Sequence, residues 1–495
     1  MNTPPEQLGR ASFTGVLWNA ATFGLSKIVV LVTTIILARL LEPADFGLLG
    51  IGLVVIGYLD FINDFGVSAA VIQHDGEPDE AASTAFWLNM ALGVTLGVVG
   101  FVAAPLLADF FAEPRAAPVI RALSLSFPLT SIGSIHDARL RRDMRFGRRV
   151  IPEFLKGVSK GAVSITMALM GYGVWSLVWG QLAGTAVAAV CYWFVFPWLP
   201  SVRFSRRTSR DLLRFGSQIT LVGLLGGLHK NVDYLVVGRR LGTRLLGLYT
   251  LAFRLPQLLV ESVVDIAGQV AFPAFSRVRA DPGRLRSGLQ RMLGMIGLII
   301  VPLGLGLALV ADPFVRVFYG PRWTAAIPVM QILSLYILVQ SLSKTCGDVY
   351  KAMGRPGILN KLAIVKLAVT VPLLLIAVPH GIVAVAIAQL ISASILTLWR
   401  LVLAARIIDV PIRDVLTPFI PSLRAGTFMT AACLLANAAT SGVGSLPAMI
   451  VLMSVGAASY LGAVWLFDRE LIGDYRRLVR RPASTPDDRP VPECA

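Results

Sequence analysis

The chain is poor in charged residues and in cysteine. Charged residues make up 15% of its 495 residues, hydrophobic residues make up 55%, and the mean hydropathy is +0.71. A soluble core of this length needs polar positions interleaved at helical or strand spacing, and long stretches of this chain have almost none. Because the four cysteines lack the spacing of metal ligands, we predict neither a disulfide nor a metal site; they are Cys191, Cys346, Cys433 and Cys494.

Two common enzyme signatures are also missing. The sequence has no Walker A motif and no H-E-x-x-H zinc motif. The gaps between its apolar runs are too short to house a soluble catalytic domain. We therefore predict that the chain is not an enzyme, that it holds no cofactor, and that it does not drive transport with ATP by itself.

Apolar runs fill most of the sequence instead. A bilayer core about 30 Å thick is crossed by about 20 apolar residues in a helix, and about fourteen runs reach that length. We predict an all-α polytopic membrane protein with transmembrane helices near residues 14–37, 47–71, 84–108, 117–137, 152–171, 174–197, 215–238, 247–273, 290–311, 325–350, 358–378, 381–405, 420–439 and 446–467.

Basic residues alternate between the gaps and so indicate orientation. Of the 45 Lys and Arg residues, 32 fall on the side that holds both termini and eight on the other side. This count assigns Lys366 and Arg400 to cytoplasmic loops. The positive-inside rule then places both termini in the cytoplasm. The net charge of +16 is explained by this topology and by anionic lipid headgroups, so we do not expect nucleic acid as a partner.

A weak internal repeat suggests two halves. Shifting the sequence by 200 residues lays Arg39 over Arg239 and Gly47 over Gly247, each between the first and second helix of a half. Duplicated bundles are common in transporters. We predict an N-terminus at 1–13, a six-helix N-lobe at 14–197, a basic linker at 198–214, a six-helix C-lobe at 215–405, two further helices with their preceding loop at 406–467, and a cytoplasmic disordered tail at 468–495.

Charged residues inside the predicted spans are candidate functional groups. A charge in hydrocarbon costs at least about 2.5 kcal/mol, so persisting charges face a cavity or a partner. We predict a central cavity for a polar, anionic substrate, with four cationic candidates: Lys27, Lys230, Arg254 and Lys344. Candidates for charge pairs or ion coupling are Asp60, Asp64, His229, Asp233, Glu261, Asp265 and Asp348.

The alternative interpretation is that these charges pair with one another and only fix helix packing. Lys27 with Asp60, and Arg254 with Asp233, are the pairs that this interpretation predicts. His229 is either a hydrogen-bonded helix residue or a proton relay. The sequence leaves these alternatives open.

Six segments resemble a known family. Residues 37–49, 64–73, 83–89, 173–178, 231–239 and 247–252 are similar to the polysaccharide transporter family, within the multidrug/oligosaccharidyl-lipid/polysaccharide flippase superfamily. The resemblance covers nearly the whole chain. It is strongest to the Wzx-type oligosaccharide flippases, the branch with colanic acid, teichuronic acid and succinoglycan exporters.

The resemblance implies a two-lobed flippase of the bacterial inner membrane. Its substrate would be a polyprenyl-diphosphate-linked oligosaccharide for exopolysaccharide or lipopolysaccharide synthesis. Alternating access would be coupled to an H+ or Na+ gradient, and the partners would be membrane lipids, a polysaccharide polymerase and glycosyltransferases. The nearest alternative is a cation-coupled multidrug or metabolite antiporter of the same superfamily, which would use Asp60, Asp64, Glu261 and Asp265. A membrane polymerase or ligase, and a scaffold without transport, fit the sequence less well.

Overall fold

The regular secondary structure in the described part of the chain is helical. The computed structural model describes residues 24, 27–63, 78–143, 145–202, 204–210, 212–214, 231–279, 281–355, 357–440 and 442–467, and no strand occurs among them. Eleven helical stretches in these ranges are long and apolar enough to cross a membrane. The all-α polytopic class is confirmed, whereas the count of fourteen spans stays a prediction.

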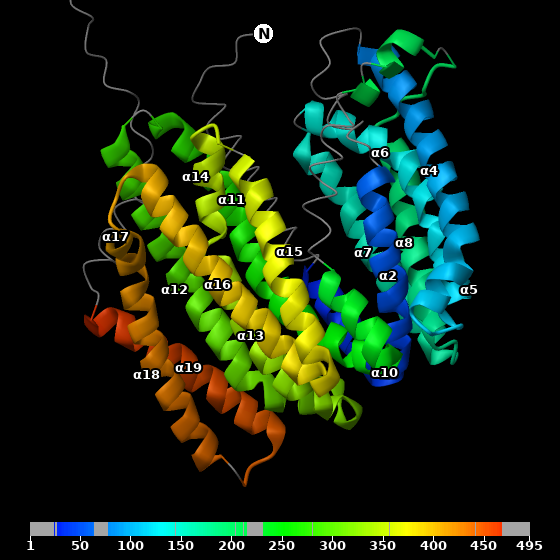
Figure 1. The fold of residues 1–495 in the computed structure, drawn as a ribbon. Coiled ribbons are helices and arrows are strands. Elements are labelled where there is room, and N and C mark those ends of the chain that lie inside the picture. The colour runs from blue at the N-terminus through cyan, green and yellow to red at the C-terminus, as the bar shows by residue number, and fades with distance from the viewer. Residues whose placement is uncertain are drawn as a thin grey trace, which may run out of the picture.

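The N-lobe contains the described residues of the predicted spans one to six. Residues 27–40 form a helix, and the chain continues into α2 (Pro43–Asn63), α4 (Pro78–Phe110), α5 (Ala116–Ser124), α6 (Ser126–Arg142), α7 (Phe146–Leu169) and α8 (Val174–Val195). Figure 1 shows them as one bundle, coloured blue to green. α7 is not among the eleven apolar stretches, and its sequence carries Arg148, Arg149, Glu153, Lys156 and Lys160.

The C-lobe begins with α10 (Val232–Pro256), which reverses the chain at Gly242. The φ of this glycine is +79°, so α10 consists of two helices that meet there, in agreement with the predicted break between residues 238 and 247. The following elements are η1 (Gln257–Glu261), α11 (Ser262–Val278), α12 (Pro282–Phe314), η2 (Val315–Tyr319), η3 (Pro321–Ala326), α13 (Ile327–Leu342) and α14 (Lys344–Ala352).

The remaining helices are the last ones of the C-lobe and those of the segment predicted at 406–467. They are α15 (Gly357–Ala377), η4 (Val378–His380), α16 (Ile382–Ile408), α17 (Ile412–Leu416), η5 (Thr417–Phe419), α18 (Ile420–Ala439) and α19 (Ser445–Phe467). α18 and α19 pack against each other and against α12, at the outer edge of the lobe. Large exposed apolar side chains on α4, α15, α18 and α19 are what a lipid-facing surface requires.

The two lobes cross where α2 packs against α10. A Cβ added to Gly47 would lie 1.8 Å from the carbonyl oxygen of Thr243, and one added to Gly247 would lie 1.7 Å from that of Pro43. The 200-residue shift maps Pro43 onto Thr243 and Gly47 onto Gly247, so the two contacts are equivalent. The two halves of the repeat therefore contact each other through equivalent positions, and the helices approach so closely there that only glycine fits at residues 47 and 247.

Candidate functional site

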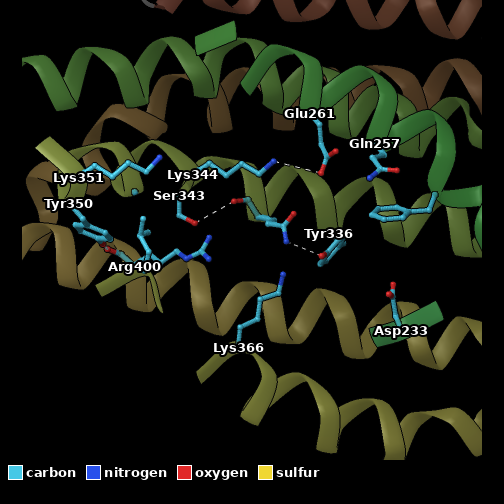
Figure 2. Close-up of a pocket in the computed structure, with 14 residues that line it drawn as sticks. Asp233, Gln257, Glu261, Tyr336, Ser343, Lys344, Tyr350, Lys351, Lys366 and Arg400 are labelled. Carbon is cyan, nitrogen blue, oxygen red and sulfur yellow. Dashed lines mark hydrogen bonds and ion pairs between the residues drawn. The ribbon is translucent and has the colours of Figure 1, made fainter. Parts of the chain in front are cut away.

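A polar cavity of about 400 Å³ lies in the C-lobe. Helices α13 to α16 supply most of its wall, with α10 and η1 on one side (Figure 2). The lining residues are Asp233, Phe253, Gln257, Glu261, Tyr336, Gln340, Ser343, Lys344, Gly347, Tyr350, Lys351, Leu359, Lys366 and Arg400. Cations outnumber carboxylates among these residues, which makes the cavity suited to an anion.

Two of these cations have no ion-pair partner among the described residues. Lys366 of α15 is only 8% exposed, and Arg400 of α16 has a buried Nε that makes no hydrogen bond in the described part of the chain. Figure 2 shows both side chains pointing into the cavity. Burying a cation without an ion pair is costly, so this arrangement favours a site that an anionic group completes.

The other cations of the cavity are compensated. Lys344 Nζ lies 3.7 Å from Glu261 Oε1, and Lys351 Nζ lies 3.1 Å from Asp348 Oδ1. Gln340 donates to the hydroxyl of Tyr336 at 2.9 Å. The cavity thus combines two unpaired cations, one ion pair across the wall and neutral hydrogen-bonding groups.

Asp233 anchors the edge of the cavity. Its carboxylate accepts hydrogen bonds from the hydroxyl of Tyr249 at 2.8 Å and from the backbone N–H of Tyr234 at 3.0 Å. Lys366 is the lysine in electrostatic contact with it. Glu261 is a second carboxylate in electrostatic contact with Lys366, although neither carboxylate forms an ion pair with it.

A second group of cations lies on the N-lobe. Lys160 Nζ donates to Gln181 Oε1 at 2.6 Å and is in electrostatic contact with Lys156 of the same helix and with Arg254 of α10. Asp60 of α2 has Lys156 as its cationic neighbour. Like charges from both lobes thus approach one another near α7 and α10.

The lobes are locked together at the end where α2 and α10 cross (Figure 1). Arg39 donates from Nε to the carbonyl of Phe318 at 2.8 Å, and also to that of Val317. Trp323 Nε1 donates to the carbonyl of Ala38 at 2.8 Å. In Figure 1 the ribbons diverge toward the other end, where α6 and α14 lie. We call the cross-lobe contacts of Arg39 and Trp323 the latch.

The second half of the repeat reproduces part of this latch. Arg239, the equivalent of Arg39, lies with its guanidinium carbon 5.7 Å from the ring centroid of Phe110. Thr243 donates to Glu113 at 3.2 Å, again across the lobes. Each half therefore uses the arginine at the end of its first helix to hold the other lobe.

Residues 36–328 match a family model described as polysaccharide biosynthesis protein. The chain belongs to this family. The match covers more than half of the chain and runs from the N-lobe across the lobe crossing into α13. It confirms the family resemblance drawn from the loop and helix segments.

Two relatives of this family member have named roles in polysaccharide synthesis. The lipopolysaccharide biosynthesis protein WzxC of Escherichia coli is 28% identical over 375 residues, which make up 74% of this chain and 75% of that protein. The teichuronic acid biosynthesis protein TuaB of Bacillus subtilis is 29% identical over 301 residues, 60% of this chain and 62% of that protein.

Two solved structures share the fold of this chain. The lipid II flippase MurJ in an inward closed conformation superposes with a TM-score of 0.76, covering 92% of this chain and 100% of that chain at 17% identity. An inward-facing multidrug resistance MATE transporter superposes with a TM-score of 0.65, covering 80% and 98% at 17% identity. These likenesses establish that the chain shares the polytopic helical fold of those two proteins.

The structure brings only part of the predicted site together. Lys344, Asp233 and Glu261 line the C-lobe cavity, and Asp348 lies beside it. Lys27 and Asp60 lie on the N-lobe side and outside this cavity, and Arg254 is exposed on α10. Lys230, His229 and Asp64 lie outside the described residues, as does the side chain of Asp265.

The predicted pair of Arg254 with Asp233 does not form among the described residues. Asp233 makes its hydrogen bonds with Tyr249 and Tyr234 instead of pairing with Arg254. Asp60 has Lys156 of α7 as its cationic neighbour, and its pairing with Lys27 stays a prediction. The rotation of each helix about its axis decides which charges meet, and hydropathy does not record that rotation.

The assignment of Lys366 and Arg400 to cytoplasmic loops is also wrong. Lys366 lies well inside α15, Arg400 lies inside α16, and both line the cavity. The sequence did indicate that these residues are not in loops, because Lys366 and Arg400 fall within the predicted spans 358–378 and 381–405. Lys156 and Lys160 of α7 were likewise not among the predicted cavity residues.

One enzyme-like motif is explained by its position in a helix. Residues 157–161 read G-V-S-K-G, which matches the G-x-S-x-G pattern of serine hydrolases. They lie within the continuous helix α7, and the hydroxyl of Ser159 donates to the carbonyl of Leu155 at 2.6 Å. The strand-to-helix turn that exposes a nucleophilic serine is therefore not formed here.

Proposed function

We propose that this protein is a flippase for a polyprenyl-diphosphate-linked oligosaccharide. It moves this substrate from the cytoplasmic to the outer leaflet of the bacterial inner membrane, for exopolysaccharide or lipopolysaccharide synthesis. Family membership and the named relatives support this function. The observation that carries it is a pair of cations without an ion-pair partner among the described residues, Lys366 and Arg400, which face one cavity inside the helical bundle.

The chemistry of the cavity fits the diphosphate of such a substrate. Guanidinium and ammonium groups form short, charge-assisted hydrogen bonds with phosphate oxygens. Tyr336 and Gln340 add neutral groups that can bind sugar hydroxyls. Each polar group left unsatisfied in hydrocarbon costs several kcal/mol, so a polar surface within the bundle removes the main barrier while the polyprenyl tail stays in lipid.

The two-lobed architecture supplies a way to alternate access. The lobes meet at the crossing of α2 with α10 and at the latch, whereas their other ends diverge. With both termini in the cytoplasm, as basic-residue counts favour, the diverging end faces the cytoplasm. Substrate binding between the lobes would then neutralise their facing cations and allow the lobes to rock about the crossing.

A cation-coupled antiporter is the second candidate function. The likeness to a MATE transporter and the carboxylates Asp233 and Glu261 in the cavity favour it. Lys366 and Arg400 argue against a cationic drug, because they would repel it. Growth of a deletion strain on a panel of cationic drugs separates the two functions, since only loss of an antiporter increases drug sensitivity.

The flippase proposal is tested by mass analysis of polyprenyl-linked glycans in cells that lack the gene. We expect a complete repeat unit to accumulate on the cytoplasmic leaflet and to disappear when the intact gene returns. Unchanged glycan pools together with normal surface polysaccharide would contradict the proposal. The same cells show whether a polymerase and glycosyltransferases depend on this protein for their substrate.

A further inference from the structure

The segment between the lobes is fastened to the N-lobe by a row of hydrogen bonds. Trp87 Nε1 of α4 donates to the carbonyl of Ser201 at 3.0 Å, and the N–H of Ser201 donates to the hydroxyl of Ser83 at 3.0 Å. The N–H of Ser205 donates to the hydroxyl of Thr84 at 3.3 Å. The segment is therefore positioned by α4, on the outside of the N-lobe.

Past these bonds the chain forms a short helix with two different faces. Residues 206–210 and 212–214 are helical. Leu212 is 2% exposed and packs against Ala82, Ala85, Phe86 and Ile135 of the N-lobe. Figure 1 shows this green helix lying across the end of the bundle near the start of α4. Its buried face is thus settled, and its other face points away from the protein.

The outward face is strongly basic. Arg206, Arg207 and Arg210 are exposed, and none forms an ion pair with a described residue. Their spacing of one and four residues places them on one side of the helix. Just before them, Leu199, Val202 and Phe204 are also exposed; Val202 is 88% exposed. Apolar side chains beside a basic helical face are typical of segments that lie in a membrane interface.

The location of this surface favours lipid over any aqueous ligand. α4 is the span with the smallest buried share, and it carries the exposed side chains Val94, Val98 and Val102. Trp87 lies on the same helix and is itself partly exposed, as an interfacial anchor would be. The linker therefore lies at the lipid-facing perimeter of the N-lobe, where headgroups of one leaflet meet it.

We propose that residues 199–202 and 204–210 form a binding surface for anionic phospholipid headgroups, with the three apolar side chains inserted among the acyl chains. Arg206, Arg207 and Arg210 bind the phosphates and the negative charge of the headgroups. This surface is distinct from the C-lobe cavity and does not depend on the transported substrate. Because the segment joins the two lobes, bound lipid holds one end of that connection at the membrane.

Native mass spectrometry of the full-length protein tests this surface, with phosphatidylglycerol and phosphatidylcholine as probes. The test variant is Arg206→Gln/Arg207→Gln/Arg210→Gln. The matched control is Arg277→Gln/Arg279→Gln/Arg406→Gln, which removes three exposed arginines elsewhere. We expect at least a tenfold loss of phosphatidylglycerol affinity in the test variant only, with phosphatidylcholine unaffected. Equal loss in both variants, or loss in neither, would overturn the proposal.

A spin label at Val202 tests the insertion separately. The label is introduced as Val202→Cys in a chain whose native cysteines are replaced, in nanodiscs of phosphatidylglycerol or of phosphatidylcholine. We expect access to oxygen and protection from a water-soluble nickel reagent in phosphatidylglycerol, and the reverse after the three arginine substitutions. Equal access to the nickel reagent in both lipids would show that anionic headgroups do not draw Val202 into the membrane, and would overturn the assignment.

Discussion

The crossing of α2 with α10 makes Gly47→Ala an informative substitution. The added Cβ would lie 1.8 Å from the carbonyl oxygen of Thr243, whereas an ordinary contact is 3.4 Å or longer. The obstacle is backbone in a close-packed crossing, so the helices must separate by about 1.5 Å. Overpacking of this kind costs about 1–3 kcal/mol, and we expect the upper half of that range. A loss of about 2 kcal/mol changes the ratio of locked to unlocked lobes roughly 30-fold.

The unlocking can be measured as a distance between the lobes. Pro118 of α5 and Arg322 of η3 are both exposed at the locked end, and pulsed dipolar spectroscopy reports the separation of spin labels at these positions in a cysteine-replaced chain. Gly306→Ala in α12 is the control, because nothing lies within 4 Å of its added Cβ. We expect a longer distance in Gly47→Ala and in the equivalent Gly247→Ala. Identical distance distributions in Gly47→Ala and Gly306→Ala would refute the reasoning.

Three further predictions concern charged residues. Lys366→Ala and Arg400→Gln should each weaken binding of a polyprenyl-diphosphate glycan about 10- to 150-fold, since a charge-assisted hydrogen bond contributes about 1.5–3 kcal/mol. Titration of the purified variants with this glycan measures the affinity. Unchanged affinity in both variants would show that the cavity is not the binding site. Arg39→Gln should lengthen the same interlobe distance, as it removes the donors to the carbonyls of Val317 and Phe318; an unchanged distance would show that the latch does not hold the lobes. Hydrogen bonding to Arg115 lowers the pKa of Glu113 below its usual 4.5. The contribution of Glu113 to the locked end is therefore complete above pH 4.5 and is lost as the pH falls through the lowered pKa. The interlobe distance should lengthen in acid for the native chain and should depend less on acid in Glu113→Gln.

The helices were predictable because the membrane imposes their length. About 20 apolar residues cross the bilayer whatever they pack against, so run length alone located most of the described helices. The break near Gly242 was predictable for a similar reason, since charge and glycine interrupt the run there. The reciprocal contact of Gly47 and Gly247 was visible only as a weak repeat, whose meaning required the packed structure.

The candidate site was only half predictable. Asp233, Glu261 and Lys344 were found because a charge within an apolar run is costly and therefore informative. Lys366 and Arg400 were assigned to loops because the orientation count sorts basic residues by membrane side and does not record burial within a helix. Their burial depends on how α15 and α16 pack, and that depth is a tertiary property.

The most direct test of the central claim is flipping by the purified protein in liposomes. A polyprenyl-diphosphate-linked oligosaccharide is placed in both leaflets, and the fraction that an external, membrane-impermeant glycan reagent modifies is followed with time. We predict that the native protein brings the protected half to the outside, and that Lys366→Ala/Arg400→Gln, reconstituted at equal amount, is at least tenfold slower. A rate for the native protein equal to that of protein-free liposomes would contradict flipping, and equal rates for both proteins would contradict the role of the C-lobe cavity.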